Sequence, residues 1–167
     1  MRQIKPEQID RDVFDLIGKD WMLVGAQKRD GSVNAMTASW GGLGVLWGKP
    51  VAFVFVRPQR YTKTFLDEAD TMSLSFFDES RRDMLTYMGK TSGRDEDKIA
   101  ASGLRVAHSG DTPYFEQARM TLIGNKRYVQ DMRAECFVDD RELRQWYPGG
   151  DLHTVYVIEI DRVLLAD

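Results

Sequence analysis

The sequence predicts a mainly β fold with short helices, in which antiparallel strands form a barrel or a sandwich. Short apolar runs recur along the chain, and Gly or Pro stands at many of their ends. The segments between these runs have the length of hairpin turns or short helices, whereas a doubly wound parallel sheet needs long helical crossovers. Because 43% of the 167 residues are hydrophobic, one core can be filled, and we expect residues 1–167 to form a single domain.

Local patterns define the expected elements in chain order. They are an amphipathic opening at residues 13–17, strands at 21–27, 33–39 and 51–56, a helix at 61–69, a strand at 72–77, helices at 80–89 and 95–103, and strands at 118–129, 135–138 and 153–160. Most neighbouring strands are joined by connections too short for a parallel crossover. The sheet is therefore expected to be antiparallel.

The expected strands are apolar runs rich in β-branched and aromatic residues. The run Val-Ala-Phe-Val-Phe-Val at 51–56 lies between Pro50 and Pro58. Asp30-Gly31 separates the runs 21–27 and 33–39, and this dipeptide is typical of a tight hairpin turn. The glycine-rich segment 41–44 is expected to interrupt the strand pattern at a place where backbones approach closely.

The expected helices show helical spacing and end signals. Tyr61, Phe65 and Leu66 recur at helical spacing, and a threonine at 62 or 64 is expected to cap this helix. Ser80 followed by Asp83 resembles a capping box, and Gly89 is expected to end the helix that it opens. The third helix is expected to stop at Gly103.

Charge and cysteine content exclude several function classes. The 23 Lys and Arg residues against 26 Asp and Glu residues give a net charge of −3, so we expect neither a nucleic acid nor a membrane as partner. No signal peptide or membrane span is expected. The single cysteine, Cys136, is expected to be a small buried hydrophobe, and with only two histidines no metal site is predicted. These features predict a soluble, cytoplasmic protein.

Motifs of common enzyme classes are missing from the sequence. It contains no phosphate-binding P-loop, no G-x-S-x-G and no H-E-x-x-H. The nearest dinucleotide fingerprint begins at Gly42 and Gly44, but Trp47 takes the place of its third glycine and would block close helix packing. A Rossmann dinucleotide site is therefore not predicted.

Two cation-bearing segments each precede an expected helix. Residues 56–63 carry three cations and no acid where a strand gives way to a helix, and a helix N-terminus offers free N–H groups to an anion. A phosphate site and a solvated loop are equally compatible with this segment alone. Residues 90–98 are a second candidate, although their mixed charges favour an exposed loop.

Two further segments suit the wall or cover of a site. Residues 34–40 alternate small and hydroxylic residues before Trp40, a composition that exposes backbone groups and suits a flat ring with polar edges. A barrel strand relieved of crowding is the alternative. Residues 146–150, Trp-Tyr-Pro-Gly-Gly, are expected to be a covering loop, either over a bound ring or within a subunit contact.

Taken in order, three motifs from these segments and a fourth near residue 150 resemble the flavin reductase-like family, and within it the flavoredoxin-type branch. They are N-A-M-T-A-S-W at 34–40, F-V-R-P-Q-R-Y-T at 55–62, S-G-R-D-x-D-K at 92–98 and D-x-H at 151–153. The resemblance spans about residues 20–160. It implies an FMN-binding split barrel, here expected as a six-stranded antiparallel Greek-key-type barrel.

The resemblance also implies an FMN held at the interface of a homodimer. The residues that would line the isoalloxazine ring are Asn34, Met36, Thr37, Ala38, Ser39 and Trp40. The residues that would hold the ribityl phosphate are Arg57, Arg60, Tyr61 and Thr62, helped by Ser92, Gly93, Arg94 and Lys98. His153 would lie near the flavin as a proton relay or orienting donor, with a hydrogen-bonded barrel histidine as the alternative.

The function implied is an FMN-dependent oxidoreductase that takes hydride from NADH or NADPH as a transient co-substrate. One alternative is a flavoredoxin-like electron carrier that serves a redox protein partner and turns over no nicotinamide. Another is a split barrel that lacks a cofactor and acts as an interaction module. The paired cationic segments argue against the last alternative.

Overall fold

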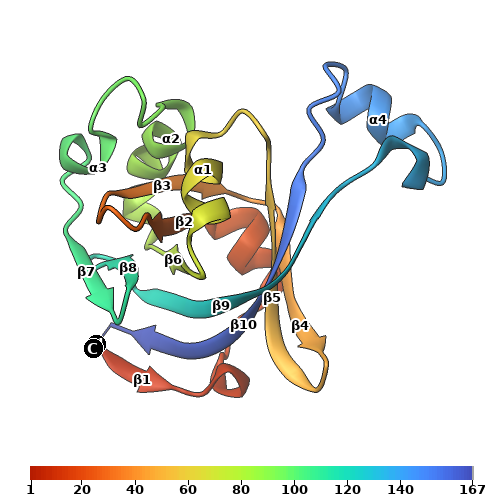
Figure 1. Ribbon diagram of the computed structural model, residues 1–167. Coiled ribbons are helices and arrows are strands. Elements are labelled where there is room, and N and C mark those ends of the chain that lie inside the picture. The colour runs from red at the N-terminus through yellow and green to blue at the C-terminus, as the bar shows by residue number, and fades with distance from the viewer. Residues whose placement is uncertain (167) are drawn as a thin grey trace.

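An antiparallel sheet of eight strands frames the molecule in the computed structural model, which describes residues 1–166 (Figure 1). Its strands are β1 (Arg2–Ile4), β2 (Met22–Gln27), β3 (Val33–Ala38), β4 (Gly41–Leu46), β5 (Lys49–Val56), β6 (Thr71–Phe76), β9 (Met120–Asp131) and β10 (Thr154–Leu165). They run in the order β3-β2-β6-β9-β10-β5-β4, and β1 pairs with β10. A separate hairpin consists of β7 (Val106–Ser109) and β8 (Thr112–Phe115).

The mainly β, antiparallel prediction is confirmed, but the strand number is not. The described residues give the sheet eight strands where six were expected. The sheet curves into a barrel. This barrel is open, because its end strands β3 and β4 are not paired with each other within residues 1–166. A core cluster between its faces includes Val24, Val54 and Tyr156.

The long pair of β9 and β10 gives the sheet much of its curvature. Its register shifts between Val157 and Ile158 and again between Ile160 and Arg162, and such bulges bend a strand pair and increase its twist. Gly124 lies at a close approach in this pair, because a Cβ there would be 2.7 Å from the Glu159 carbonyl oxygen. Only glycine fits this backbone spacing without a shift.

Helices cover one side of the sheet. They are α1 (Tyr61–Glu68), α2 (Arg82–Lys90) and α3 (Lys98–Ala101), while α4 (Arg141–Trp146) lies apart from them (Figure 1). Both α1 and α2 contact β2 and β3. A second apolar cluster, which includes Leu23, Leu85 and Phe115, fills the space under α2.

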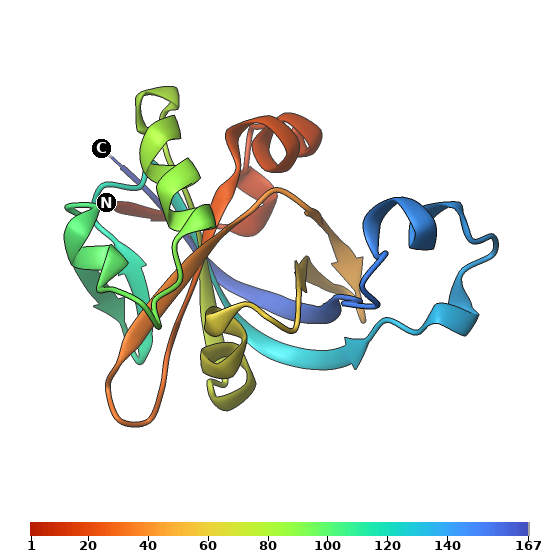
Figure 2. The ribbon, with the colours of Figure 1, turned by 90° about the horizontal axis from the view of Figure 1, so that it is seen from above.

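Residues 132–153 leave the sheet between β9 and β10 and project from the body (Figures 1 and 2). This segment, which we call the arm, contains a 3₁₀ turn at Ala134–Cys136 followed by α4. The strand expected at 135–138 is therefore wrong, and Cys136 is exposed rather than buried. The local apolar run could not reveal that no sheet edge is available to these residues.

The glycine-rich segment 41–44 is a second correction, because it is part of β4 and does not interrupt the strand pattern. Its expected close backbone approach is confirmed at Gly41, where a Cβ would be 2.6 Å from the Phe53 carbonyl oxygen. The hairpin to β5 turns at Trp47 and Gly48, which both have positive φ, as a type I′ turn requires.

The other expected elements lie close to their predicted places, but the helix caps differ. No side chain caps α1, whose N-cap is Arg60, and none caps α2, whose N-cap is Arg81. A 3₁₀ turn at Glu79–Arg81 leads directly into α2. The backbone hydrogen bonds of this turn take the place of the expected capping box.

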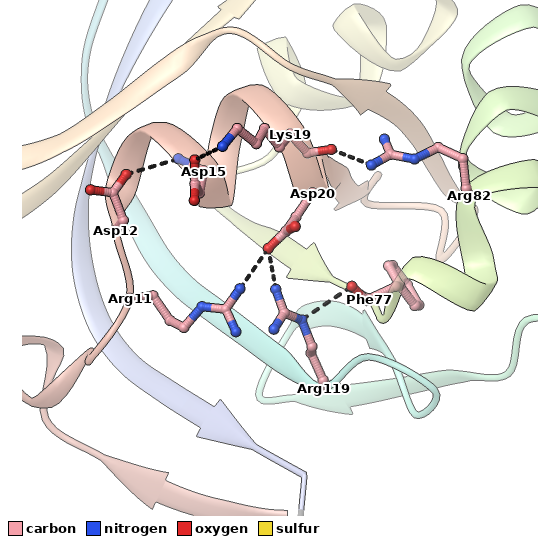
Figure 3. A network of polar contacts seen from close by, with 8 residues as sticks. All are labelled: Arg11, Asp12, Asp15, Lys19, Asp20, Phe77, Arg82 and Arg119. Carbon is pink, nitrogen blue, oxygen red and sulfur yellow. Dashed lines mark hydrogen bonds and ion pairs between the residues drawn. The ribbon is translucent and has the colours of Figure 1, made fainter.

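A polar network attaches the segment before β2 to the rest of the body (Figure 3). Asp15–Asp20 forms a π-helical segment, and the Asp20 carboxylate accepts hydrogen bonds from both Arg11 and Arg119. Arg119 also donates from Nε to the Phe77 carbonyl oxygen at 3.1 Å. One carboxylate shared by two guanidinium groups thus fixes the chain where it enters β2.

Candidate functional site

A cavity of about 240 Å³ opens where the ends of β3 and β5 meet the arm. We call it the aromatic cavity, because four of its side chains carry aromatic rings. Its lining residues are Met36, Thr37, Ala38, Ser39, Trp40, Phe55, Arg57, Arg60, Trp146 and His153. Trp40 lies edge-on to Trp146, with ring centroids 5.1 Å apart, so one wall comes from the body and the other from the arm.

The body wall of this cavity is the last part of β3 and the two residues after it. Thr37 donates from Oγ1 to the Leu85 carbonyl oxygen at 2.6 Å, which attaches the strand to α2. Gly89 permits this approach, since a Cβ there would be only 3.2 Å from the Thr37 Cβ. The sequence prediction of a wall at 34–40 is consistent with this placement.

A second, smaller cavity of about 140 Å³ adjoins the first and shares Met36 and Arg60 with it. Its lining residues are Met36, Gln59, Arg60, Tyr61, Thr62, Lys90, Thr91, Ser92 and Lys98. The N-terminus of α1 lies here, and the first amides of a helix have no partner within the helix. We call this cavity the cationic cradle.

The buried or partly buried cations of the cradle, Lys98 and Arg60, have no acidic partner among the described residues. Arg60 donates to the Gly89 carbonyl oxygen at 2.7 Å, and Lys98 donates from Nζ to the Met88 and Thr91 carbonyl oxygens, both at 2.9 Å. Among the described residues neither forms an ion pair, although Lys98 is only 3% exposed. Arg60 is partly buried beside it. A buried charge normally has a counterion, so the buried Lys98 next to a second cation indicates an anion site.

The pKa values reflect this lack of compensation. Burial, and then repulsion from Arg60, lowers the pKa of Lys98 to about 8. Burial likewise lowers the pKa of Arg60. A dianionic phosphate placed between them would favour the charged form of both side chains.

Asn34 and Gly93 fix the shape of the cradle. The Asn34 side chain is buried and donates from Nδ2 to the Thr62 hydroxyl at 3.1 Å. A Cβ on Gly93 would be 2.6 Å from the Asn34 Oδ1, so any larger residue at this position would have to displace the Asn34 side chain. Neither of these two sequence-predicted residues lines the cradle. Asn34 instead holds the lining residue Thr62 by a hydrogen bond, and Gly93 packs against Asn34.

Arg57 and Arg94 lie differently from the other predicted phosphate ligands. Arg57 lines the aromatic cavity and forms an ion pair with Asp151, so its charge is already compensated. Arg94 is exposed, with its guanidinium 4.7 Å from the centre of the Tyr61 ring, and it donates to the Gln59 carbonyl oxygen at 3.3 Å. Neither lines the cradle.

His153 is buried at the base of the arm and lines the aromatic cavity. Burial, and then the nearby Arg57 charge, lowers its pKa to about 4, although Asp151 opposes this shift. The imidazole is therefore neutral at neutral pH. Its ring centroid is 5.2 Å from that of Trp40, so it completes the aromatic wall.

Sequence reasoning missed several lining residues. Phe55 was inside the matched segment 55–62 but was treated only as part of a strand, and Gln59 and Thr91 lie within segments that were chosen for their charges. Trp146 was expected in a covering loop, and the structure places it in the cavity wall.

A third cavity of about 240 Å³ continues the site beneath α2, between Trp21 and Lys90.

The family of the chain is shown by comparison of its sequence with protein families. The family model described as "Flavin reductase like domain" matches residues 15–167. The chain belongs to this family. The recognition made from four motifs is thereby confirmed, while a search of curated protein sequences finds no match.

Solved structures similar to this member of the flavin reductase-like family share its fold. The flavoredoxin of Desulfovibrio vulgaris (Miyazaki F) is 23% identical with a TM-score of 0.70, covering 98% of this chain and 78% of its own. The FMN-binding protein from Thermus thermophilus is 22% identical with a TM-score of 0.69, covering 100% and 83%. The styrene monooxygenase flavin reductase of Pseudomonas putida S12 is 13% identical with a TM-score of 0.65, covering 89% and 80%. The predicted split-barrel fold is thus confirmed.

The described residues offer neither a metal site nor a membrane-spanning helix. Within residues 1–166 no group of three or more His, Cys, Asp or Glu side chains is placed to hold a metal ion. None of the helices in the same residues has the length and apolar character that spanning a membrane requires.

Proposed function

We propose that this flavin reductase-like chain binds FMN and acts as an FMN-dependent oxidoreductase with NADH or NADPH as hydride donor. The observation that carries the proposal is a pair of uncompensated cations, the buried Lys98 and the partly buried Arg60, in a cradle that adjoins a cavity with aromatic walls. A ligand that fits both cavities joins an anionic group to a planar ring.

The donor set of the cradle suits a phosphate monoester. Arg60 and Lys98 supply charge, Thr62 and Ser92 supply hydroxyl groups, and the start of α1 supplies backbone amides. A charge-assisted hydrogen bond contributes about 1.5–3 kcal/mol, so several of them together can hold a dianion. The resemblance assigned the same role to these residues.

The aromatic cavity suits the isoalloxazine ring. Thr37, Ser39 and Trp40 would present backbone and ring surface to one face of the flavin, while Trp146 would limit the access of water from the arm side. FMN, when bound, supplies the hydride-accepting ring, and the protein supplies its position and electrostatic environment. His153, neutral at neutral pH, is available as a hydrogen-bond donor beside that ring.

A second copy of the chain is the proposed partner at this site. Trp40 and Trp146 remain 39% and 44% exposed at the mouth of the aromatic cavity, and Val138 is fully exposed on the arm. Such apolar groups are typical of an interface surface. A homodimer that covers them would enclose the FMN, and we propose a redox protein as a further partner. The lone, exposed Cys136 fits a reducing compartment, and we propose the cytoplasm.

Reconstitution tests this function directly. The protein incubated with FMN and freed of excess ligand is expected to retain the visible flavin spectrum, to sediment as a dimer and to oxidise NADH or NADPH in steady state. Reduction by a redox protein without nicotinamide turnover would instead identify an electron carrier. Protein that stays colourless after reconstitution would overturn FMN binding and support an interaction module.

The affinity for FMN is expected to fall as the pH rises above about 8. In the ligand-free protein Lys98, whose pKa is about 8, loses its proton in this range, whereas bound phosphate favours its charged form. Binding above pH 8 must therefore take up a proton, and the Kd should increase by up to about tenfold per pH unit. Titrations followed by flavin fluorescence between pH 7 and 9.5 measure the slope. Lys98→Met should bind more weakly and lose this slope, and an unchanged slope in that variant would contradict the assignment.

A further inference from the structure

His153 presents its two ring nitrogens to different surroundings. Nδ1 lies 2.8 Å from the hydroxyl oxygen of Tyr147, and both side chains are buried. Nε2 has no hydrogen-bond partner among residues 1–166 and is not one of their fully buried unpaired atoms. Because His153 lines the aromatic cavity, Nε2 is the nitrogen that remains open to it.

The direction of the bond between Tyr147 and His153 follows from the needs of the hydroxyl group. A neutral imidazole offers one donor and one acceptor, and a buried tyrosine hydroxyl must donate its hydrogen to an acceptor. Among the described residues, Nδ1 of His153 is the acceptor within reach of Tyr147. Burial raises the pKa of Tyr147, so the hydroxyl keeps its proton. Tyr147 therefore donates to Nδ1, and the imidazole hydrogen is left on Nε2.

An ion pair at the end of β5 fixes this part of the arm. The Arg57 guanidinium forms an ion pair with Asp151, donates to the Trp146 carbonyl oxygen at 2.8 Å and lies 5.1 Å from the centre of the Tyr147 ring. Gln59 donates to the same Asp151 carboxylate at 2.7 Å. One arginine of the body thus contacts three residues of the arm around His153.

We propose that Tyr147, Arg57 and Asp151 are positioning residues that hold His153 as an Nε2–H donor directed into the aromatic cavity. This N–H group would donate a hydrogen bond to an acceptor atom of a planar ligand, either a carbonyl oxygen or an unprotonated ring nitrogen. The inference rests on the proposed function for the identity of that ligand, whereas the tautomer of His153 is a property of the chain itself.

Nitrogen NMR of the ligand-free protein tests the tautomer. The chain has two histidines, so a ¹⁵N-labelled sample gives few imidazole signals, and a His108→Gln variant assigns those of His153. At neutral pH we expect Nε2 of His153 to have the shift of a protonated nitrogen and Nδ1 that of an unprotonated one. A hydrogen on Nδ1, a charged ring or an even mixture of tautomers would overturn the proposal.

Tyr147→Phe removes the hydroxyl group and keeps the ring. The Nδ1 and Nε2 shifts of His153 are expected to move toward those of a mixture of tautomers, because the hydroxyl group that donates to Nδ1 is gone. A merely structural tyrosine would leave the shifts unchanged. If the single Nε2–H tautomer persists in this variant, Tyr147 does not position His153.

Asp151→Asn tests the ion pair, with Asp140→Asn as its matched control on the same arm. Asp140 is the N-cap residue of α4 and pairs with Arg144 of that helix, and both side chains are exposed. Asp151→Asn should speed amide hydrogen exchange in residues 132–153 by at least about tenfold, which corresponds to a loss of about 1.4 kcal/mol of local stability. It should also mix the tautomers of His153. Asp140→Asn should leave the His153 signals unchanged. Equal effects of the two variants would overturn the positioning role.

Addition of FMN separates this inference from the proposed function. If FMN binds, the Nε2 signal of His153 is expected to shift, and an unmoved signal would overturn the donor role. If FMN does not bind, the proposed function fails, while the ligand-free spectra still decide the tautomer and its dependence on Tyr147.

Discussion

Arg60→Gln is expected to weaken FMN binding by about 10- to 100-fold and to leave riboflavin binding unchanged. Arg60 is a cradle cation without an acidic partner, and the loss of one charge-assisted hydrogen bond costs about 1.5–3 kcal/mol. Riboflavin has the same ring without the phosphate, so it reports any general damage to the site. Fluorescence titration of both ligands against wild type and variant gives the ratio.

The same variant makes a second measurement possible. Because Arg60 is one of the causes of the lowered Lys98 pKa, its removal should raise that pKa and move the pH dependence of FMN affinity to higher pH. Arg105→Gln is the control, since Arg105 pairs with Glu116 on an exposed face next to the β7–β8 hairpin. If FMN and riboflavin affinities fall together in Arg60→Gln, the side chain holds the fold of the site and not the phosphate.

Gly124→Ala is expected to lower the free energy of unfolding by about 3 kcal/mol. The added methyl group would lie 2.7 Å from the Glu159 carbonyl oxygen and 3.0 Å from the Ile158 Cδ1, inside the longest strand pair. Backbone atoms of a paired strand cannot move aside locally, so the overpacking strains both strands. Urea unfolding followed by circular dichroism measures the loss.

Gly44→Ala is the matched control for this prediction. Gly44 also lies in a strand, but the nearest atom to an added Cβ is in the Phe53 ring, at an ordinary contact distance of 3.7 Å. The unfolding free energy of this variant should stay within about 0.5 kcal/mol of the wild type. Equal losses in both variants would mean that the substitution acts through the general cost of changing a strand glycine.

Local patterns predicted most of the sheet because strand preference is local. The runs 21–27, 33–39, 51–56 and 72–77 all form strands, and the Asp-Gly turn joins the first two. The prediction failed at segment 41–44, because whether glycines interrupt or continue a strand depends on the neighbouring backbone. It failed at 135–138 because an apolar run needs a sheet edge to pair with, and the arm has none.

The candidate site was partly visible in the sequence because ligand chemistry requires particular residue types. The segments 56–63 and 90–98 were chosen for their cations, and the structure brings Arg60 and Lys98 to one cradle. Arg57 carries the same charge in the same segment, yet Asp151 neutralises it from 94 residues away. A sequence pattern cannot distinguish a free cation from a paired one when the partner is distant.

The sequence by itself determined the strand content, the two cationic segments and the family, since all three depend on the order and chemistry of neighbouring residues. Only the tertiary structure decided which cations lack a counterion, which nitrogen of His153 faces the cavity and where the arm meets the body. Those properties depend on burial and on contacts between distant segments, because the energy of a charge or a hydrogen bond is set by everything packed around it.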